Sequence, residues 1–318
     1  IENRQIHNQN NVFYLYNHDF KLALQLIVSF IQDFCFIYLL RFTILTPMIE
    51  SLLLGLLQGL AEFLPISSSG HLVLGKSLLG MKDVGMFFDV MLHAGTLLSI
   101  FVFFRKKLLQ IIVGIFKKEK ESCQYAFYVI LASIPTAIIG IGFKDALESL
   151  FTNPRAVSIA LLFTGTLLFL TRFAKQTDKE EFASMTWWKA LVIGVVQGIA
   201  CIPGISRSGS TISAMLFLKV NRKFAGEFSF LMSIPAVGGA ALLDFKHWLE
   251  CQGADALMQS CQDAGAFNIA LLAGMVVAFA SGLFALRWLI TFVQKGKFHH
   301  FAWYVWVAGI LGLLFIHP

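Results

Sequence analysis

Apolar residues run through most of this chain in long blocks, which short polar stretches separate. The uninterrupted blocks cover residues 87–104, 124–142, 155–171, 224–245, 266–290 and 301–316. A helix needs about 20 apolar residues to cross a bilayer, and these blocks are of that order. The pattern therefore predicts six transmembrane helices in an all-α integral membrane protein.

Two further apolar stretches, 51–80 and 187–219, are interrupted and nearly repeat each other. The segment Gly55–His71 recurs 139 positions later as Gly194–Ser210. Each copy has a short apolar helix, a break that contains a proline, a serine-rich turn and a second short helix. Non-helical backbone at membrane depth survives only where protein or water satisfies its polar groups. We therefore expect two re-entrant helix hairpins that line a wet cavity.

Each half of the chain thus contains one hairpin followed by three spanning helices, with repeat 1 over 48–173 and repeat 2 over 187–318. Because an odd number of crossings separates the two hairpins, the second copy is inverted relative to the first. The predicted fold is a single membrane domain over 48–318. It is an inverted-topology repeat with six transmembrane helices plus two re-entrant helix hairpins.

The basic residues support this layout, because lysine and arginine accumulate on the cytoplasmic side of membrane proteins. Segments assigned to the cytoplasm hold sixteen of them: Arg105, Lys106, Lys107, Lys117, Lys118, Lys120, Arg172, Lys175, Lys179, Lys189, Lys219, Arg222, Lys223, Arg287, Lys295 and Lys297. The other side holds five: Lys76, Lys82, Lys144, Arg155 and Lys246. This bias sets the predicted orientation.

Composition excludes an ordinary soluble domain. The chain is 57% hydrophobic and 14% charged, whereas globular chains carry about 25% charged residues. Its net charge of +6 comes from clusters between apolar blocks, without the basic-aromatic face of a nucleic-acid binder. The cysteines show no metal-ligand spacing; Cys251 and Cys261 share one loop, where they either pair in a disulfide or remain free thiols.

The first 47 residues differ from the rest. They begin at Ile1 with a polar, Asn-rich stretch, and the apolar residues that follow contain Asp33 and Arg41. Met48 opens the first repeat, so one interpretation is that it is the natural start and that 1–47 is a leader outside the membrane domain. The alternative is an additional membrane anchor. A cleaved signal peptide fits less well, because the apolar stretch is long and far from the end.

The first hairpin carries an acid and a base. Gln58 and Glu62 are four residues apart and share one helix face. An ionisable residue inside an apolar segment is costly without a partner and marks a functional site. After the proline break, the serine run 67–69 can cap the next helix, and His71 lies three residues after Ser68 on the same face.

The second hairpin carries a cation and hydroxyls in place of the acid and the base. Arg207 lies among Ser206, Ser208, Ser210 and Thr211 at the start of a short helix. A helix N-terminus attracts anions, and a guanidinium matches two phosphate oxygens at once. The sequence therefore predicts a phosphate-binding site that combines both hairpins. Whether Asp89 and His93, a further i,i+4 pair, reach this site or only bond to each other or to a neighbouring helix is left open.

These residues resemble one bacterial family, the undecaprenyl-diphosphate phosphatases, also called bacitracin resistance proteins. The resemblance covers about residues 48–316. One motif, (E/Q)xxxE followed by PxSSxGH, corresponds to Gln58 to Glu62 and to residues 65–71. The other, PGxSRSxxT, corresponds to residues 203–211.

The resemblance implies a multi-pass enzyme of the bacterial cytoplasmic (inner) membrane. It would hydrolyse undecaprenyl diphosphate to undecaprenyl phosphate and inorganic phosphate, recycling the lipid carrier of peptidoglycan synthesis and conferring bacitracin resistance. Its site would open to the periplasmic side and use a divalent cation, Mg²⁺ or Ca²⁺. Expected partners are the polyprenyl diphosphate and membrane lipids, with a homodimer left open and no nucleic acid.

The expected roles are distributed over both motifs. Catalysis is assigned to Glu62, Ser68, His71 and Arg207, and diphosphate binding to Gln58, Ser67, Ser206, Ser208 and Thr211, with Glu62 as the metal ligand. Many relatives carry Glu where this chain has Gln58, so the cation would be held through Glu62 and the substrate phosphates. The nucleophile stays open between Ser68, His71 and water.

Two other functions share part of this pattern. Inverted repeats with broken helices also describe secondary transporters, and a lipid-binding scaffold without turnover would need only the phosphate site. The acid and base of the first hairpin favour an enzyme, because a carrier needs neither. Phosphate release by the purified protein would separate the three hypotheses.

Overall fold

The computed structural model describes residues 48–79, 86–175, 182–251 and 269–316. The chain divides into two compact units, Ile1–Ile49 and Glu50–Pro318, and the second contains nearly all described residues. The predicted leader and the loop that holds Cys261 lie outside the described residues. Those that are described form helices and turns without any strand, so the prediction of an all-α protein is confirmed.

The two interrupted stretches fold as helix hairpins at the predicted places. In the first, a helix over residues 48–63 is followed by a turn and then by α2 (Ser68–Leu79). In the second, α8 (Trp187–Ile199) is followed by a turn and by α9 (Arg207–Phe217). In both copies the proline lies in the turn beyond the end of the first helix, where its missing N–H costs no helical hydrogen bond.

The remaining helices follow in chain order: α3 (Met86–Phe103), α4 (Arg105–Phe116), α5 (Lys120–Gly142), α6 (Lys144–Phe151), α7 (Pro154–Leu170), α10 (Arg222–Leu231), α11 (Ser233–Cys251), α12 (Ile269–Gln294) and α13 (Phe301–Phe315). Single 3₁₀ turns flank them at Thr171–Phe173, Phe182–Ser184 and Phe298–His300. Helix α7 shows a clear start signal, because Pro154 occupies its first turn and the Asn153 side chain accepts bonds from two backbone N–H groups.

Five stretches of helix are long and apolar enough to cross a membrane: 120–142, 154–173, 222–250, 269–294 and 298–315. They coincide with five of the six predicted spans. The sixth, 87–104, is helical as α3, but its apolar part is shorter than the others. Two helices were not predicted: α4 lies between the predicted spans 87–104 and 124–142, and α6 is a short segment before α7.

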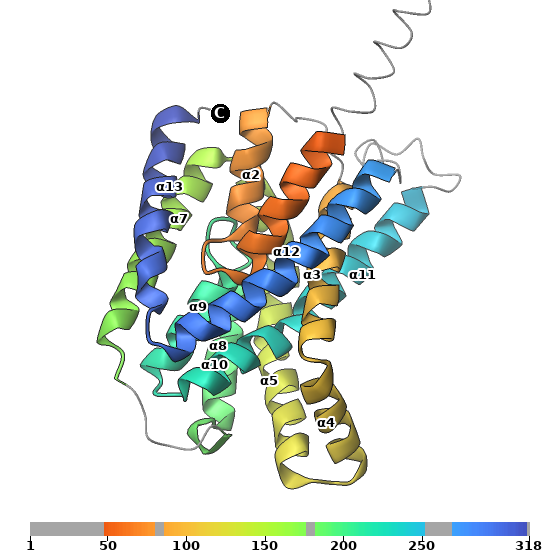
Figure 1. The fold of residues 1–318 in the computed structure, drawn as a ribbon, viewed down its shortest axis with the longest axis vertical. Helices are drawn as coiled ribbons and strands as arrows, with labels where there is room; N and C mark the ends of the chain where they lie inside the picture. Colours follow the sequence, from red (N-terminus) through yellow and green to blue (C-terminus); the bar gives the residue numbers. More distant parts are fainter. Residues whose placement is uncertain (1–47, 80–85, 176–181, 252–268, 317–318) are drawn as a thin grey trace, which may run out of the picture. The chain divides into compact units, whose positions relative to one another are not determined.

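The packing pairs the halves of the chain in a regular way (Figure 1). The long helices α7 and α13 lie side by side, α5 packs against α8, and α12 packs against α3. The first helix contacts α12, since a Cβ at Gly55 would collide with the Gly274 carbonyl. The corresponding glycine of the second hairpin, Gly194, contacts the Ala132 carbonyl of α5 in the same way. Each of the two corresponding glycines thus packs against the backbone of a helix from the other half of the chain.

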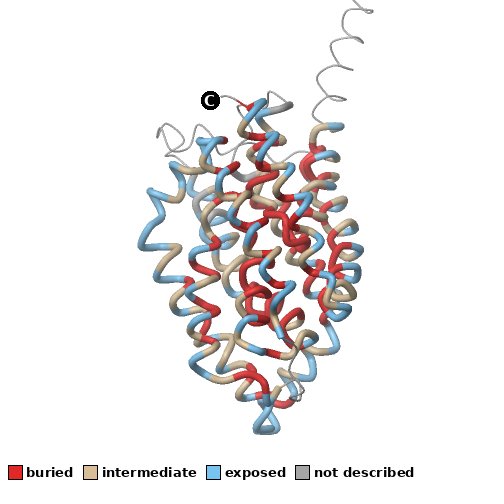
Figure 2. The backbone as a smooth tube through the Cα atoms, turned by 90° about the vertical axis from the view of Figure 1, so that its left-hand side faces the viewer, coloured by how far each residue is buried: buried red, intermediate tan, exposed pale blue. Residues whose placement is uncertain are grey.

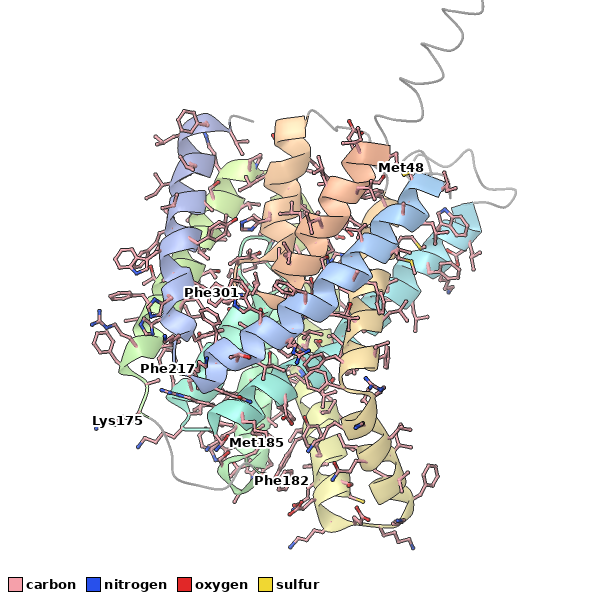
Figure 3. All side chains as sticks on the ribbon, in the orientation of Figure 1. Met48, Lys175, Phe182, Met185, Phe217 and Phe301 are labelled. Atoms are coloured by element: carbon pink, nitrogen blue, oxygen red, sulfur yellow. The ribbon has the colours of Figure 1, made fainter. Side chains whose placement is uncertain are left out.

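The outer surface of the helices is apolar. Figure 2 shows buried residues inside the helix array and exposed residues on its outward faces. Many of the exposed residues are large and apolar, for example Ile138, Phe163, Val276 and Leu314. Side chains project outward along the whole length of the long helices (Figure 3). A hydrocarbon environment accounts for such a surface, and the structure therefore supports a multi-pass membrane protein.

Candidate active site

Glu62, at the end of the first helix, is the centre of a polar cluster that joins the two hairpins. Its Oε1 accepts a hydrogen bond from Nη2 of Arg207 at 2.6 Å. Its Oε2 accepts one from Oγ of Ser68 at 2.6 Å and one from Nε2 of Gln58 at 3.2 Å. The side chain is almost fully buried. The acid of one repeat and the cation of the other therefore form one site.

The turns of the two hairpins pack directly against each other, which brings these side chains together. A Cβ at Gly70 would lie 3.0 Å from Cα of Gly204, and one at Gly209 would lie 3.3 Å from Cβ of Pro65. Gly70 and Gly209 occupy equivalent positions in the two copies. Gly204 also needs its lack of a side chain, since its φ is +95°. Small residues thus allow the two turns to meet.

Arg207 is the first residue of α9, and its side chain is largely buried. Besides the bond to Glu62, its Nη1 lies 3.5 Å from the backbone oxygen of Ser229. The hydroxyl of Ser229 in turn lies 2.7 Å from that of Thr211. A buried guanidinium that keeps its ion pair and has further donors is suited to bind an anion beside the carboxylate.

The other hydroxyls predicted to bind diphosphate hold the backbone in this structure. Ser206 caps α9 by accepting a bond from the Gly209 N–H at 3.0 Å. Ser208 lies 3.3 Å from the Leu64 carbonyl of the first hairpin, and Thr211 donates to the Arg207 carbonyl at 2.9 Å. These side chains shape the turn around Arg207, and none of them bonds to Glu62 among the contacts of the described residues.

His71 is part of the first hairpin but points away from Glu62 toward α13. Its Nδ1 lies 2.9 Å from the backbone oxygen of Ser67, and its Nε2 lies 2.9 Å from the hydroxyl of Tyr304. The imidazole and the phenol ring are stacked, with centroids 5.6 Å apart. The described contacts of His71 do not include Ser68 or Glu62. The structure thus brings Gln58, Ser68 and Arg207 to Glu62, but not His71.

His93 approaches the site from α3, whereas Asp89 does not. Nε2 of His93 is 3.9 Å from Oε2 of Glu62, and its Nδ1 is 2.7 Å from the Asp89 backbone oxygen. The Asp89 carboxylate instead pairs with Lys76 at 2.6 Å. The i,i+4 spacing in an apolar segment was the sequence signal for His93. No local signal distinguishes Ser229 or Tyr304, because their partners are distant in the chain.

The donor atoms around Glu62 fit a hard divalent cation. Oε1 of Gln58 is buried and has no hydrogen-bond partner, although its amide nitrogen is bonded to Glu62. Carboxylate and amide oxygens are ligands for Mg²⁺ and Ca²⁺, and Mg²⁺ keeps most of its waters or takes oxygens from a phosphate. No group of three or more acidic, His or Cys side chains suited to a metal occurs among the described residues. A cation bound to Glu62 and Gln58 would need further ligands, which a bound phosphate-containing substrate could supply.

Comparison with known proteins gives a consistent result. The family model described as bacitracin resistance protein BacA matches residues 51–311. An undecaprenyl-diphosphatase of Carboxydothermus hydrogenoformans is 40% identical over 261 residues, which covers 82% of this chain and 94% of that protein. One of Halothermothrix orenii is 42% identical over 258 residues, or 81% and 94%. One of Alkaliphilus metalliredigens is 40% identical over 280 residues, or 84% and 98%.

Proposed function

The chain belongs to the bacitracin resistance protein BacA family and dephosphorylates undecaprenyl diphosphate, and we propose that it does so at the Glu62 cluster. The observation that carries this proposal is the position of Glu62 between Ser68 and Arg207. One oxygen of the carboxylate accepts a hydrogen bond from the hydroxyl of Ser68, and the other accepts one from the guanidinium of Arg207. In this proposal Glu62 is the base, and it directly contacts both the nucleophile, Ser68, and the group that binds the phosphate, Arg207.

Ser68 is the nucleophile in this mechanism. Its hydroxyl donates to Oε2 of Glu62 at 2.6 Å, the arrangement that activates a serine. Glu62 takes the proton as Oγ bonds to the terminal phosphorus. The bond to the bridging oxygen breaks, and undecaprenyl phosphate leaves with the electron pair. Water then hydrolyses the phosphoserine, and Glu62 returns the proton to Ser68.

Arg207 binds the phosphoryl group that is transferred. Charge develops on the non-bridging oxygens, and catalysis of this reaction is mostly positioning and charge stabilisation. The guanidinium keeps one bond to Glu62 and has further N–H donors for the substrate. The positive end of α9, at whose first residue Arg207 lies, adds to the attraction. Nε2 of His93 lies 3.9 Å from Oε2 of Glu62, next to the oxygen that Ser68 contacts.

Glu62 and Gln58 would hold a divalent cation together with oxygens of the diphosphate. Such a cation neutralises phosphate charge and makes the phosphorus more electrophilic. The unpartnered Oε1 of Gln58 supports this assignment. The donors of this chain are weaker than a pair of carboxylates, so cation affinity in the absence of substrate is expected to be low.

The Gln58→Glu variant is expected to bind the cation more tightly, because a second carboxylate would face the site. We expect the Mg²⁺ concentration for half-maximal phosphate release to fall by about tenfold, in line with the gain of one charged ligand. Titration calorimetry of the substrate-free protein with Mg²⁺ gives a readout independent of turnover. An unchanged cation response in both measurements would mean that residue 58 does not contact the metal.

We infer that the site opens to the periplasmic side of the cytoplasmic membrane and that the fold is the inverted repeat of six spans and two re-entrant hairpins. The sixteen-to-five charge bias and the equivalent contacts of Gly55 and Gly194 support this placement. A cysteine introduced at position 110, between α3 and α5, should react only with reagents that reach the cytoplasm. Labelling by an impermeant reagent added to intact cells would reverse the orientation.

Replacing Ser68 by Ala tests the function of the cluster. We expect the purified variant to release phosphate from undecaprenyl diphosphate at least about 100-fold more slowly than the wild type, because the nucleophile is absent. Substrate labelled in its terminal phosphate should leave acid-stable label on wild-type protein and none on the variant. If the variant keeps more than about a tenth of the rate, a barrier change under about 1.4 kcal/mol, water attacks directly.

A further inference from the structure

Tyr304 reaches into the first hairpin from the last helix of the chain. Half of its surface is exposed, as expected on a lipid-facing helix, yet its hydroxyl lies 2.9 Å from Nε2 of His71. The two rings are also stacked, with an interplanar angle of 14°. A phenol in an apolar environment needs a partner for its hydroxyl, and His71 supplies it. The contact joins α13 to α2.

The hydrogen bonds of His71 define which nitrogen carries its proton. Its Nδ1 faces the backbone oxygen of Ser67, which can only accept, so the proton of the neutral ring is on Nδ1. Nε2 then has a free electron pair, which accepts the hydroxyl proton of Tyr304. The carbonyl therefore fixes the tautomer, and the phenol, as the second hydrogen-bond partner of the ring, fixes the orientation of the imidazole.

The oxygen that His71 binds belongs to the peptide group that leads into Ser68. The backbone N–H of His71 lies 3.1 Å from this Ser67 oxygen, and Nδ1 lies 2.9 Å from it. Both electron pairs of the carbonyl are thus used. Ser67 itself has a φ of +70°, a conformation that a serine adopts only when its surroundings hold it. The imidazole thus contributes a side-chain hydrogen bond that holds this peptide in place.

We propose that Tyr304 is a positioning residue for the phosphatase reaction, acting through His71 and the Ser67 peptide to hold Ser68 against Glu62. The proposal rests on the function assigned above to Ser68. The chain of contacts runs from the phenol to the imidazole, from the imidazole to the carbonyl, and from the next residue to the carboxylate. Each of these three hydrogen bonds is at most 2.9 Å long. Loss of the bond from Tyr304 would free the imidazole of His71, which holds the Ser67 peptide.

The Tyr304→Phe variant removes one oxygen and keeps the ring stack. We expect its kcat to fall about 10- to 100-fold, as when the group that orients a catalytic constellation is lost, with KM within about twofold of wild type. Tyr128→Phe is the matched control, because Tyr128 stacks on Phe182 outside the cluster. The control should keep wild-type kcat, and both variants should keep the wild-type unfolding temperature in detergent. A Tyr304→Phe protein with a kcat within about twofold of wild type would overturn the proposal.

A second readout does not depend on turnover. In ¹⁵N-labelled wild-type protein, with His71 assigned by a His71→Gln variant, we expect the proton on Nδ1 and an acceptor at Nε2. In Tyr304→Phe the Ser67 carbonyl still holds the proton on Nδ1, and we expect the Nε2 resonance to move to that of an imidazole nitrogen without a hydrogen bond. A proton on Nε2 in the wild type, or identical spectra in both proteins, would overturn the proposal. If Ser68→Ala retains turnover, the function assigned to Ser68 fails instead, and the ¹⁵N spectra still report whether Tyr304 orders His71.

Discussion

The Glu62→Gln variant is expected to lose about 1,000-fold or more in kcat, within the range for removal of a general base. The amide has the shape of the carboxylate and can still accept a bond from Arg207 through its oxygen. The amide cannot take the proton of Ser68. It is also neutral, so the positive charge of Arg207 is no longer balanced. Phosphate release from undecaprenyl diphosphate by the detergent-purified protein measures this loss.

The matched control is Glu148→Gln. Glu148 lies on α6, is exposed and pairs with Lys144 one helical turn away at 3.5 Å, so the same chemical change should leave kcat unchanged. Because Glu62 is half of a buried ion pair, the Glu62 variant must also be compared by its unfolding temperature. A folded Glu62→Gln protein with more than about a tenth of wild-type kcat would remove Glu62 from the chemistry.

The Arg207→Lys variant is expected to be about 100-fold slower, although it keeps the positive charge. The guanidinium uses one N–H for Glu62 at 2.6 Å and presents others to the phosphoryl group. An ammonium is a point charge on a flexible stem and cannot make both contacts in a fixed plane. Near-normal turnover by the lysine variant would mean that Arg207 serves only to neutralise Glu62.

Arg222→Lys serves as the control for this change. Arg222 begins α10 as Arg207 begins α9, but no contact connects it to Glu62 in the described part of the chain. Its replacement should leave phosphate release at the wild-type rate. Loss of activity in both variants to the same extent would indicate a general effect on the fold.

The hairpins and most spans could be predicted because they depend on local signals. The proline breaks, the serine runs and the long apolar blocks state where helices end and where they cross a membrane. Helix α4 was not predicted, because the basic residues at its start end the preceding apolar block. Apolar residues such as Leu109 and Ile112 nevertheless follow them.

The site could be predicted only as far as the repeat itself revealed it. Comparing the two copies showed Glu62 and His71 in one and Arg207 in the other, which suggested that both halves contribute. The sequence could not show that His71 turns toward Tyr304, 233 residues away, whereas His93 lies near Glu62. Such contacts follow from how α3 and α13 pack, and no local pattern reports that packing.

A double-mutant cycle on phosphate release tests most directly the claim that both hairpins form one active site. Single-turnover rates would be measured for wild type, Glu62→Gln, Arg207→Lys and the double variant, with undecaprenyl diphosphate labelled in its terminal phosphate. When two residues act as a unit on one transition state, replacing the second adds little to the loss caused by the first. The single-turnover rate of the double variant should therefore be about 1,000-fold below wild type, as for Glu62→Gln alone. Multiplied losses of about 100,000-fold would show that the two residues act independently and would contradict a single shared site.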